Sequence, residues 1–238
     1  MLRETVPDLD KLVEPDRIHR LCYTDPELFE LELKNIFEKT WIYAGHESQI
    51  PNPGDYWTFD IARQPMVMLR DAQRRIGVFY NRCPHRGAKL CTLLGGYAGK
   101  EIRCSYHGWS YDLDGKLAAI PHEQGYQGTR LSREDPQFSM ARAPRMESYR
   151  GFVFASLAKN GPSLLDWLGP AKIGIDDMCD RAPEGEVEVV PNCYRVIQHS
   201  NWKLFLENQL DVSHPMVVHE STGRAALEVE NEIFDRTG

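Results

Sequence analysis

Two short motifs in this 238-residue sequence each place a cysteine close to a histidine. Cys83 and His85 are separated by one residue, Cys104 and His107 by two, and eighteen residues lie between the motifs. Together they supply two thiolates and two imidazoles. This donor set suits a tetrahedral zinc ion, and it also suits a 2Fe–2S cluster in which two cysteines hold one iron and two histidines hold the other. The ligand types alone leave both metals open.

A glycine follows each motif and favours the cluster. Gly87 comes two residues after His85, and Gly108 follows His107 directly, so each ligand pair is predicted to lie in a tight loop. Glycine lets the backbone come close to a bulky cluster and point N–H groups at its sulfides. We therefore expect two loops, at the tips of two hairpins, to enclose one cluster.

The two motifs, Cys-Pro-His-Arg-Gly from Cys83 and Cys-Ser-Tyr-His-Gly-Trp-Ser-Tyr from Cys104, resemble the Rieske domain of bacterial ring-hydroxylating oxygenases. The resemblance implies that Cys83 and Cys104 bind one iron and that His85 and His107 bind the other. The gap between the motifs is slightly longer than is usual in this family, which predicts a small loop insertion.

A second group of chemically active residues lies near the C-terminal end. Residues 201–211 are predicted to form a helix capped by Ser200 or Asn201, which places Glu207, Asp211 and His214 on one face. Pro215 disfavours continuation of the helix. A break there would allow His214 and His219 to reach one metal, and two histidines with a carboxylate are typical of a non-haem Fe(II) site. From spacing alone, a solvated helix face with incidental histidines explains the pattern equally well.

This second group also resembles the oxygenase α subunits, through Asn201-Trp202-Lys203 and the spacing of Asp211, His214 and His219. The resemblance implies that His214 and His219 bind a mononuclear iron. It also implies that Asp211 hydrogen-bonds a ligand histidine and links it to a cluster histidine of a neighbouring subunit. The family often has Tyr at the position of Ser213, so that local contact is expected to differ.

The third iron ligand in that family is an aspartate far downstream, and no position among these 238 residues corresponds to it. The sequence is therefore interpreted as the N-terminal portion of an α subunit. A natural split subunit and a degenerate gene product are the alternatives. If the 238 residues are the entire protein, we expect a loaded cluster and a weak or empty mononuclear site.

The predicted fold class is α+β, in three parts. Residues 1–40 form an arm and a helix over 26–40, which Asp25 caps and Pro26 begins. Residues 41–158 form the all-β Rieske 2Fe–2S domain, and residues 159–238 begin a truncated, helix-grip-like α+β catalytic domain. The expected strands are 41–45, 56–61, 66–70, 76–81, 109–111, 116–118, 142–149, 151–157 (buried on both faces), 187–190 and 193–199, with a short helix over 163–168 capped by Ser163.

Composition excludes several other classes of protein. The net charge of −7 argues against a nucleic-acid partner, and no apolar stretch is long enough to span a membrane. The N-terminus lacks the features of a signal peptide, so a cytoplasmic protein is predicted. In that compartment no disulfides are expected. The four cysteines outside the motifs are interpreted as small buried apolar residues: Cys22, Cys91, Cys179 and Cys193.

The resemblance implies a terminal oxygenase component. A reductase or ferredoxin would reduce the 2Fe–2S cluster, and the mononuclear Fe(II) would use O2 to hydroxylate an aromatic ring, typically to a cis-dihydrodiol. The sequence over residues 24–32 and 46–51 is most similar to the branch of this family that acts on benzoate-type aromatic acids. A homotrimer, with or without small β subunits, is implied. Two alternatives remain: a Rieske protein that only transfers electrons, and a structural zinc module.

Overall fold

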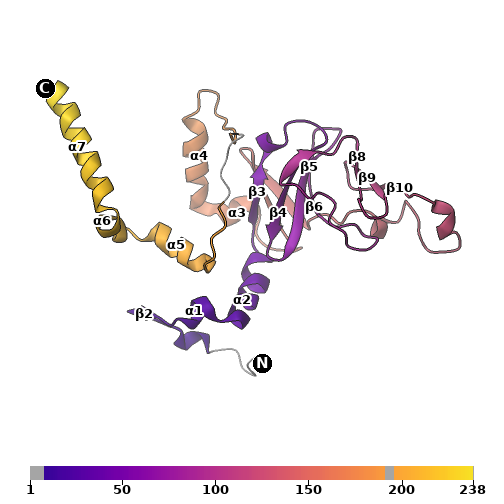
Figure 1. Cartoon of the computed structure of the whole chain (residues 1–238), viewed down its shortest axis with the longest axis horizontal. Helices are drawn as coiled ribbons and strands as arrows, with labels where there is room; N and C mark the ends of the chain where they lie inside the picture. The colour runs from indigo at the N-terminus through magenta and orange to yellow at the C-terminus, as the bar shows by residue number, and fades with distance from the viewer. Residues whose placement is uncertain (1–7, 191–195, 238) are drawn as a thin grey trace. The chain divides into compact units, whose positions relative to one another are not determined.

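The computed structural model describes residues 8–190 and 196–237, which divide into two compact units (Figure 1). The larger unit is Glu30–Cys193, and the smaller combines Met1–Phe29 with Tyr194–Gly238. In the described residues the larger unit is built mainly on antiparallel strands and the smaller mainly on helices. The predicted α+β class is therefore confirmed.

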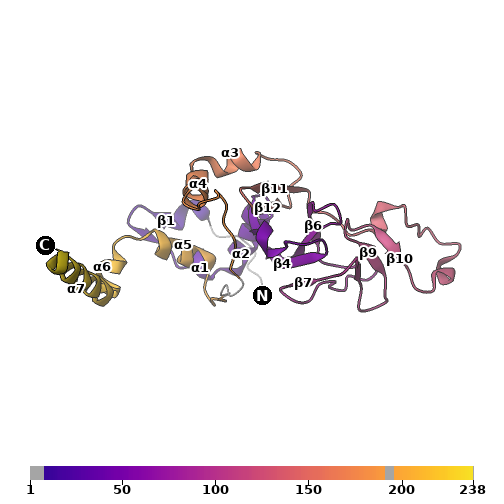
Figure 2. The same ribbon diagram turned by 90° about the horizontal axis from the view of Figure 1, so that it is seen from above.

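The larger unit contains three small antiparallel sheets, with strand orders β6-β5-β4-β7, β11-β12-β3 and β10-β9-β8 (Figure 2). The predicted strands from 56 to 81 and the hairpin around Asp114-Gly115 are confirmed. The strands are β3 (Ile42–His46), β4 (Asp55–Ile61), β5 (Gln64–Arg70), β6 (Ile76–Tyr80), β7 (Gly95–Tyr97), β8 (Glu101–Arg103), β9 (Ser110–Asp112), β10 (Leu117–Ala119), β11 (Arg145–Tyr149) and β12 (Phe152–Ser156).

Strand β5 separates the two hydrophobic cores of this unit. Side chains alternate between the faces of a strand, so Met66 and Met68 enter one core, whereas Val67 and Leu69 enter the other. The first core is completed by residues of β3 and β12. The second is completed by residues of β8, β9 and β10, and it also contains Cys83 and Cys104. The ligand cysteines predicted from the sequence are therefore part of a packed core.

Two predictions about strands in this unit are wrong. Strand β12 is not buried on both faces, because Phe152 and Phe154 are half-exposed and pack against Tyr43. Residues 187–190 form no strand, although they alternate in polarity. The backbone N–H of Val189 donates instead to the Ser48 hydroxyl at 2.9 Å, so this segment is held by a side chain. Of the expected strand 193–199, residues 193–195 lie outside the described residues and 196–199 have no regular structure.

Two helices follow β12: α3 (Leu164–Leu168), capped by Ser163 as predicted, and α4 (Lys172–Asp180). The sequence analysis did not predict α4. This helix is attached to the β11–β12 turn, because Asp176 accepts a hydrogen bond from the Tyr149 hydroxyl at 2.6 Å and Asp180 pairs with Arg150 at 2.8 Å.

The smaller unit joins the two ends of the chain. Its elements are β1 (Val13–Glu14), β2 (Arg17–Ile18), α1 (Leu21–Thr24), the start of α2 (Pro26–Glu32), α5 (Trp202–Leu210), α6 (His214–Val218) and α7 (Glu220–Thr237). Asp25 caps α2 through the N–H groups of Glu27 and Leu28, as expected. The predicted helix 26–40 is α-helical only to Glu32 and continues as a π-helical turn over Leu33–Phe37.

Asn81 supports the first ligand loop from inside the larger unit. Its buried side-chain amide donates to the Cys91 carbonyl at 2.7 Å, and its oxygen accepts from the N–H groups of Leu90 and Cys91 at 3.2 and 2.8 Å. Each of these backbone groups is buried and would lack a partner without this side chain. Asn81 therefore closes the loop that contains Cys83 and His85.

Replacing Asn81 with Ala should lower the free energy of unfolding by about 3 kcal/mol, because three backbone hydrogen bonds are lost without replacement by water. Urea denaturation followed by circular dichroism measures this change. Asn160→Ala, at an exposed position after β12, is the matched control and should change stability by less than about 0.5 kcal/mol. Equal stabilities of the two variants would contradict this role of Asn81.

Candidate metal centre

The two ligand loops are closed in the same way. In each, the cysteine carbonyl accepts from a glycine N–H four residues later, Gly87 at 2.8 Å and Gly108 at 3.0 Å. In each, the cysteine N–H donates at 2.8 Å to the carbonyl of the residue after that glycine. Both glycines have a left-handed φ, 72° and 71°, which residues with a Cβ rarely adopt. The two loops therefore have the same backbone geometry, although cysteine and histidine are spaced differently in each.

The two thiols of the motifs are buried and adjacent. The Cys83 sulfur lies 3.0 Å from the hydroxyl of Tyr111, which is fully buried on β9. Burial raises the pKa of the Cys83 thiol most, the nearby Cys104 thiol also raises it, and the hydrogen bonds from Tyr111 and from the His85 N–H oppose them. Burial also raises the pKa of Tyr111, so this hydroxyl remains a donor. A bound cation would offset the cost of burying two thiolates.

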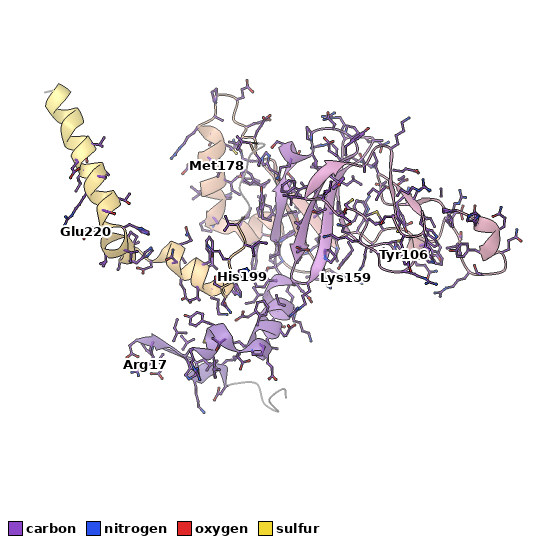
Figure 3. The ribbon with its side chains drawn as sticks, in the orientation of Figure 1. Arg17, Tyr106, Lys159, Met178, His199 and Glu220 are labelled. Carbon is purple, nitrogen blue, oxygen red and sulfur yellow. The ribbon has the colours of Figure 1, made fainter. Side chains whose placement is uncertain are left out.

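The two imidazoles of the motifs face each other, with ring centroids 4.6 Å apart. Burial, His107 and Arg86 together lower the pKa of His85, which keeps its ring neutral and able to bind a metal. The His85 ring stacks on Trp109 at 4.6 Å and an interplanar angle of 1°. Tyr106, exposed beside His107, marks the second loop in Figure 3.

The donors of the two loops fit a 2Fe–2S cluster. The Nδ1 atom of His85 is buried and has no hydrogen-bond partner, so its lone pair is available to an iron. Among the side chains that the structure describes, in residues 8–190 and 196–230, no three of His, Cys, Asp or Glu converge as ligands of one ion. A 2Fe–2S cluster of this type needs only two protein ligands at each iron, two thiolates and two imidazoles, and the loops present these as two pairs.

The second predicted site is only partly assembled. His214 and His219 lie close together, with ring centroids 5.7 Å apart, in and directly after α6. The helix breaks earlier than predicted: α5 ends at Leu210, and Pro215 lies in the first turn of α6, where it needs no N–H partner. Glu207 lies on α5, whereas Asp211 and His214 lie beyond its end, so the three do not share one helical face.

Asp211 holds the start of α6. Its carboxylate accepts from the backbone N–H of Ser213 at 2.7 Å and of His214 at 3.4 Å, and the Ser213 contact contributes most to lowering the pKa of Asp211. The other Asp211 oxygen is 3.4 Å from Nδ1 of His214, too poorly aligned for a hydrogen bond, so this buried nitrogen has no partner. The structure therefore places Asp211 beside His214, as expected, but the predicted hydrogen bond between their side chains is not formed.

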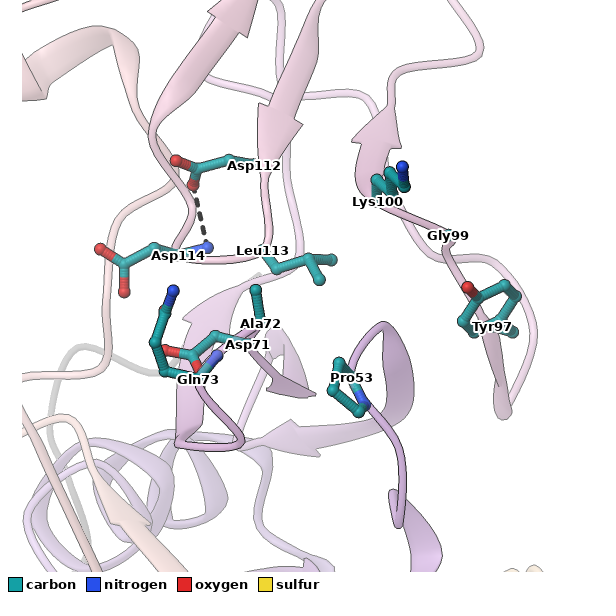
Figure 4. A pocket seen from close by; sticks show the side chains of 10 residues that line it. All are labelled: Pro53, Asp71, Ala72, Gln73, Tyr97, Gly99, Lys100, Asp112, Leu113 and Asp114. Carbon is teal, nitrogen blue, oxygen red and sulfur yellow. Dashed lines mark hydrogen bonds between the residues drawn. The ribbon is translucent and has the colours of Figure 1, made fainter.

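A cavity of about 410 Å³ lies in the larger unit (Figure 4). It is lined by residues of the β5–β6 turn, the β7–β8 connection and the β9–β10 hairpin, among them Asp71, Tyr97 and Asp112. Asp112 accepts from the Asp114 N–H at 2.9 Å, which shapes the hairpin turn. None of the four candidate cluster ligands lines this cavity, so we assign it no role in metal binding.

Sequence reasoning missed three side chains that form the centre. Tyr111 contacts the Cys83 sulfur, Trp109 stacks on the His85 ring, and Asn81 closes the first loop. Trp109 and Tyr111 lie within the second motif, five and seven residues after Cys104. Cys91 is buried in the core near the first loop, as expected, and burial raises the pKa of its thiol to about 12.

Residues 40–134 match the Rieske [2Fe-2S] domain family, in agreement with the fold and the donor set of the two loops. The chain is related to α subunits of aromatic dioxygenases. It is 38% identical over 217 residues to the toluate 1,2-dioxygenase α subunit of Pseudomonas putida, and 44% identical over 206 residues to the anthranilate 1,2-dioxygenase large subunit of Acinetobacter baylyi. The resemblance to ring-hydroxylating oxygenase α subunits, inferred from the motifs, is confirmed by these similarities.

These relationships extend over most of this chain but not over most of the relatives. The two alignments cover 89% and 85% of the chain, but 47% and 42% of the relatives. A solved structure of naphthalene 1,2-dioxygenase from Rhodococcus sp. with bound indole is similar at a TM-score of 0.79 and 33% identity, over 86% of this chain and 46% of that one. The chain thus spans under half the length of each of these three relatives. Among the described residues, no helix is both apolar enough and long enough to cross a bilayer.

Replacing Tyr111 with Phe should lower the reduction potential of a bound cluster by about 20–70 mV, because the lost hydrogen bond stabilises the more negative, reduced state. Spectroelectrochemical titration measures this shift. Tyr97→Phe removes an exposed hydroxyl that has no hydrogen-bond partner among the described residues, and it should leave the potential unchanged. An unchanged or higher potential in Tyr111→Phe would contradict a hydrogen bond from this hydroxyl to a cluster ligand.

Proposed function

We propose that this chain is the cluster-carrying part of an aromatic ring-hydroxylating oxygenase α subunit. Cys83 and Cys104 would hold one iron of the 2Fe–2S cluster, and His85 and His107 would hold the other. The observation that carries this proposal is the convergence of two thiols and two imidazoles on two loops of identical closure within a Rieske domain.

A bound cluster would supply one-electron transfer, at a higher potential than a cluster held by cysteines alone. The protein's own residues hold the ligands in place. Trp109 fixes the rotation of the His85 ring by stacking on it, and Tyr111 donates toward the Cys83 sulfur. The surrounding core excludes water from both sulfurs, which strengthens these contacts.

The second centre in this proposal is a mononuclear Fe(II) held by His214 and His219. That iron would supply oxygen activation next to an aromatic ring. Asp211 restrains His214 by accepting from its backbone N–H and by lying 3.4 Å from its Nδ1. In an assembled oxygenase, Asp211 would also connect this histidine to a cluster histidine of a neighbouring subunit. The described residues contain no third ligand beside this pair.

The substrate and assembly are part of the same proposal. The relatives named for toluate and anthranilate act on aromatic acids, so we propose a benzoate-type acid as substrate and O2 as the oxidant. A homotrimer, with or without small β subunits, would place one subunit's cluster near another's iron. The incomplete second site favours one alternative, a Rieske protein that transfers electrons without oxygenating a substrate itself.

A basic rim around the ligand loops supports a reductase or ferredoxin as electron donor. Five cationic side chains are exposed here, and none forms an ion pair with a described residue: Arg82, Arg86, Lys89, Lys100 and Arg103. The rim contrasts with the net charge of −7 of the chain. Opposite charges accelerate the encounter of two proteins, so an acidic donor surface would be steered toward the cluster.

Metal analysis tests the proposed function. The purified chain should contain two irons and two acid-labile sulfides per cluster and should absorb visible light. His107→Ala should abolish this absorption, because one iron loses a protein ligand, whereas His122→Ala, in an exposed loop, should retain it. His214→Ala should retain the cluster but lose any iron beyond two per chain. Stoichiometric zinc, or normal colour in His107→Ala, would contradict the proposal.

Charge reversal tests the basic rim. The Arg86→Glu and Lys89→Glu variants should each slow reduction of the cluster by an acidic ferredoxin by about tenfold at low salt, with the difference shrinking as ionic strength rises. Stopped-flow absorbance measures the rate. Lys172→Glu, at the start of α4, is the matched control and should reduce at the wild-type rate. Equal rates in all three variants would remove the rim from the docking surface.

A further inference from the structure

Tyr23, in the N-terminal part of the smaller unit, holds helix α5 through both its side chain and its backbone. Its hydroxyl lies 3.0 and 2.9 Å from the two carboxylate oxygens of Glu207. Its backbone carbonyl accepts from the side-chain amide of Asn201 at 3.2 Å. The Lys203 ammonium lies 6.0 Å from the centre of its ring. These contacts span α5 from its N-cap to its last turn, although 184 residues separate Tyr23 from Glu207.

Glu207 connects the contacts of Tyr23 to the pair of His214 and His219. The Glu207 carbonyl accepts from the Asp211 N–H at 2.9 Å, which ends α5. The Asp211 carboxylate then accepts from the N–H groups of Ser213 and His214 and approaches the His214 ring. A continuous series of contacts therefore runs from Tyr23 through Glu207 and Asp211 to His214.

We propose that Tyr23 is a positioning residue for the metal site of His214 and His219, acting through its hydrogen bond to Glu207. This inference rests on the mononuclear iron of the proposed function and goes beyond it, because nothing in that function requires the N-terminal segment. The contacts of Tyr23 described above are with α5 and its N-cap, so Tyr23 would act on the two histidines by fixing α5. Burial raises the pKa of Tyr23, and Glu207 raises it further, consistent with a hydroxyl that remains a donor.

The physical basis is the ordering of a short helix. Helix α5 has nine residues, too few to be stable in isolation, and most of its side chains are exposed. The contacts with Tyr23 therefore supply order that its own sequence does not. Without them the turn at Asp211 would sample more orientations, and two imidazoles that must meet at one metal would do so less often.

The test compares Tyr23→Phe, Glu207→Ala and their double variant in the full 238-residue chain. Ferrous iron is titrated anaerobically, and its binding is read from the electron paramagnetic resonance signal of its nitrosyl complex. Each single variant should bind iron about two- to tenfold more weakly, the range expected for one hydrogen bond. The double variant should be no weaker than the weaker single, because both remove one interaction.

Three controls separate this role from a general loss of structure. Glu207→Gln keeps an acceptor for the Tyr23 hydroxyl and should restore nearly wild-type iron binding. Glu228→Ala removes an exposed carboxylate from α7 and should change nothing. The visible absorption of the 2Fe–2S cluster should be the same in every variant. Loss of this absorption would contradict the proposed function rather than the role of Tyr23.

Hydrogen exchange supplies a readout without iron. The amides of α5 should exchange faster in Tyr23→Phe than in the wild type, while those of β5 should not change. Wild-type iron binding in Tyr23→Phe, additive losses in the double variant, or unchanged exchange in α5 would each overturn the inference. So would a wild-type chain that binds no iron at His214 and His219 while keeping its cluster, an outcome that leaves the cluster part of the proposed function standing.

Discussion

The metal centre depends on the closure of two loops by the same pair of backbone hydrogen bonds. A cysteine whose N–H and carbonyl are both engaged has little freedom to change the direction of its side chain. Cys83 and Cys104 are fixed in this way, and the left-handed glycine four residues after each makes the closure possible. The facing imidazoles of His85 and His107 lie within these two turns, and the Tyr111 hydroxyl reaches the Cys83 sulfur from β9.

Burial then determines the chemical state of the ligands. The same core that excludes water from the loops raises the pKa of Cys83 and lowers that of His85. Without metal, both groups are therefore neutral, which avoids uncompensated charge in the core. A neutral imidazole is already a ligand, whereas the thiols must lose their protons to bind. Metal binding at this site would therefore release protons from the thiols. The positive charge of the metal would compensate the two buried thiolates.

The cluster motifs were predictable from the sequence because each ligand and each glycine lies within one short loop. The Asp-Gly hairpin and the central strands were predictable for the same reason. Long-range contacts were not: Tyr111 reaches Cys83 across 28 positions, and α4 is held by side chains of the β11–β12 turn. The prediction of a strand over 187–190 was wrong. Alternating polarity indicates that a segment lies on a surface, but it does not show whether the edge of a sheet is free to pair with that segment.

The C-terminal elements contrast with the Rieske domain. Helices α5, α6 and α7 leave large apolar side chains exposed in their described residues, such as Leu210, Met216 and Val217. The two histidines there are close together but lack a third ligand among the described residues. The larger unit thus holds its two candidate ligand cysteines in a packed core, whereas the proposed order of the histidine pair comes in part from Tyr23.

The central claim is that two thiolates hold one iron and two imidazoles hold the other. Pulsed electron paramagnetic resonance of the dithionite-reduced protein, labelled with ¹⁵N-histidine, tests it most directly. The account predicts hyperfine couplings from two directly bound histidine nitrogens, with both lost together with the cluster in His107→Ala. A paramagnetic cluster without coupling to histidine nitrogen, or no such signal after reconstitution with iron and sulfide, would contradict it.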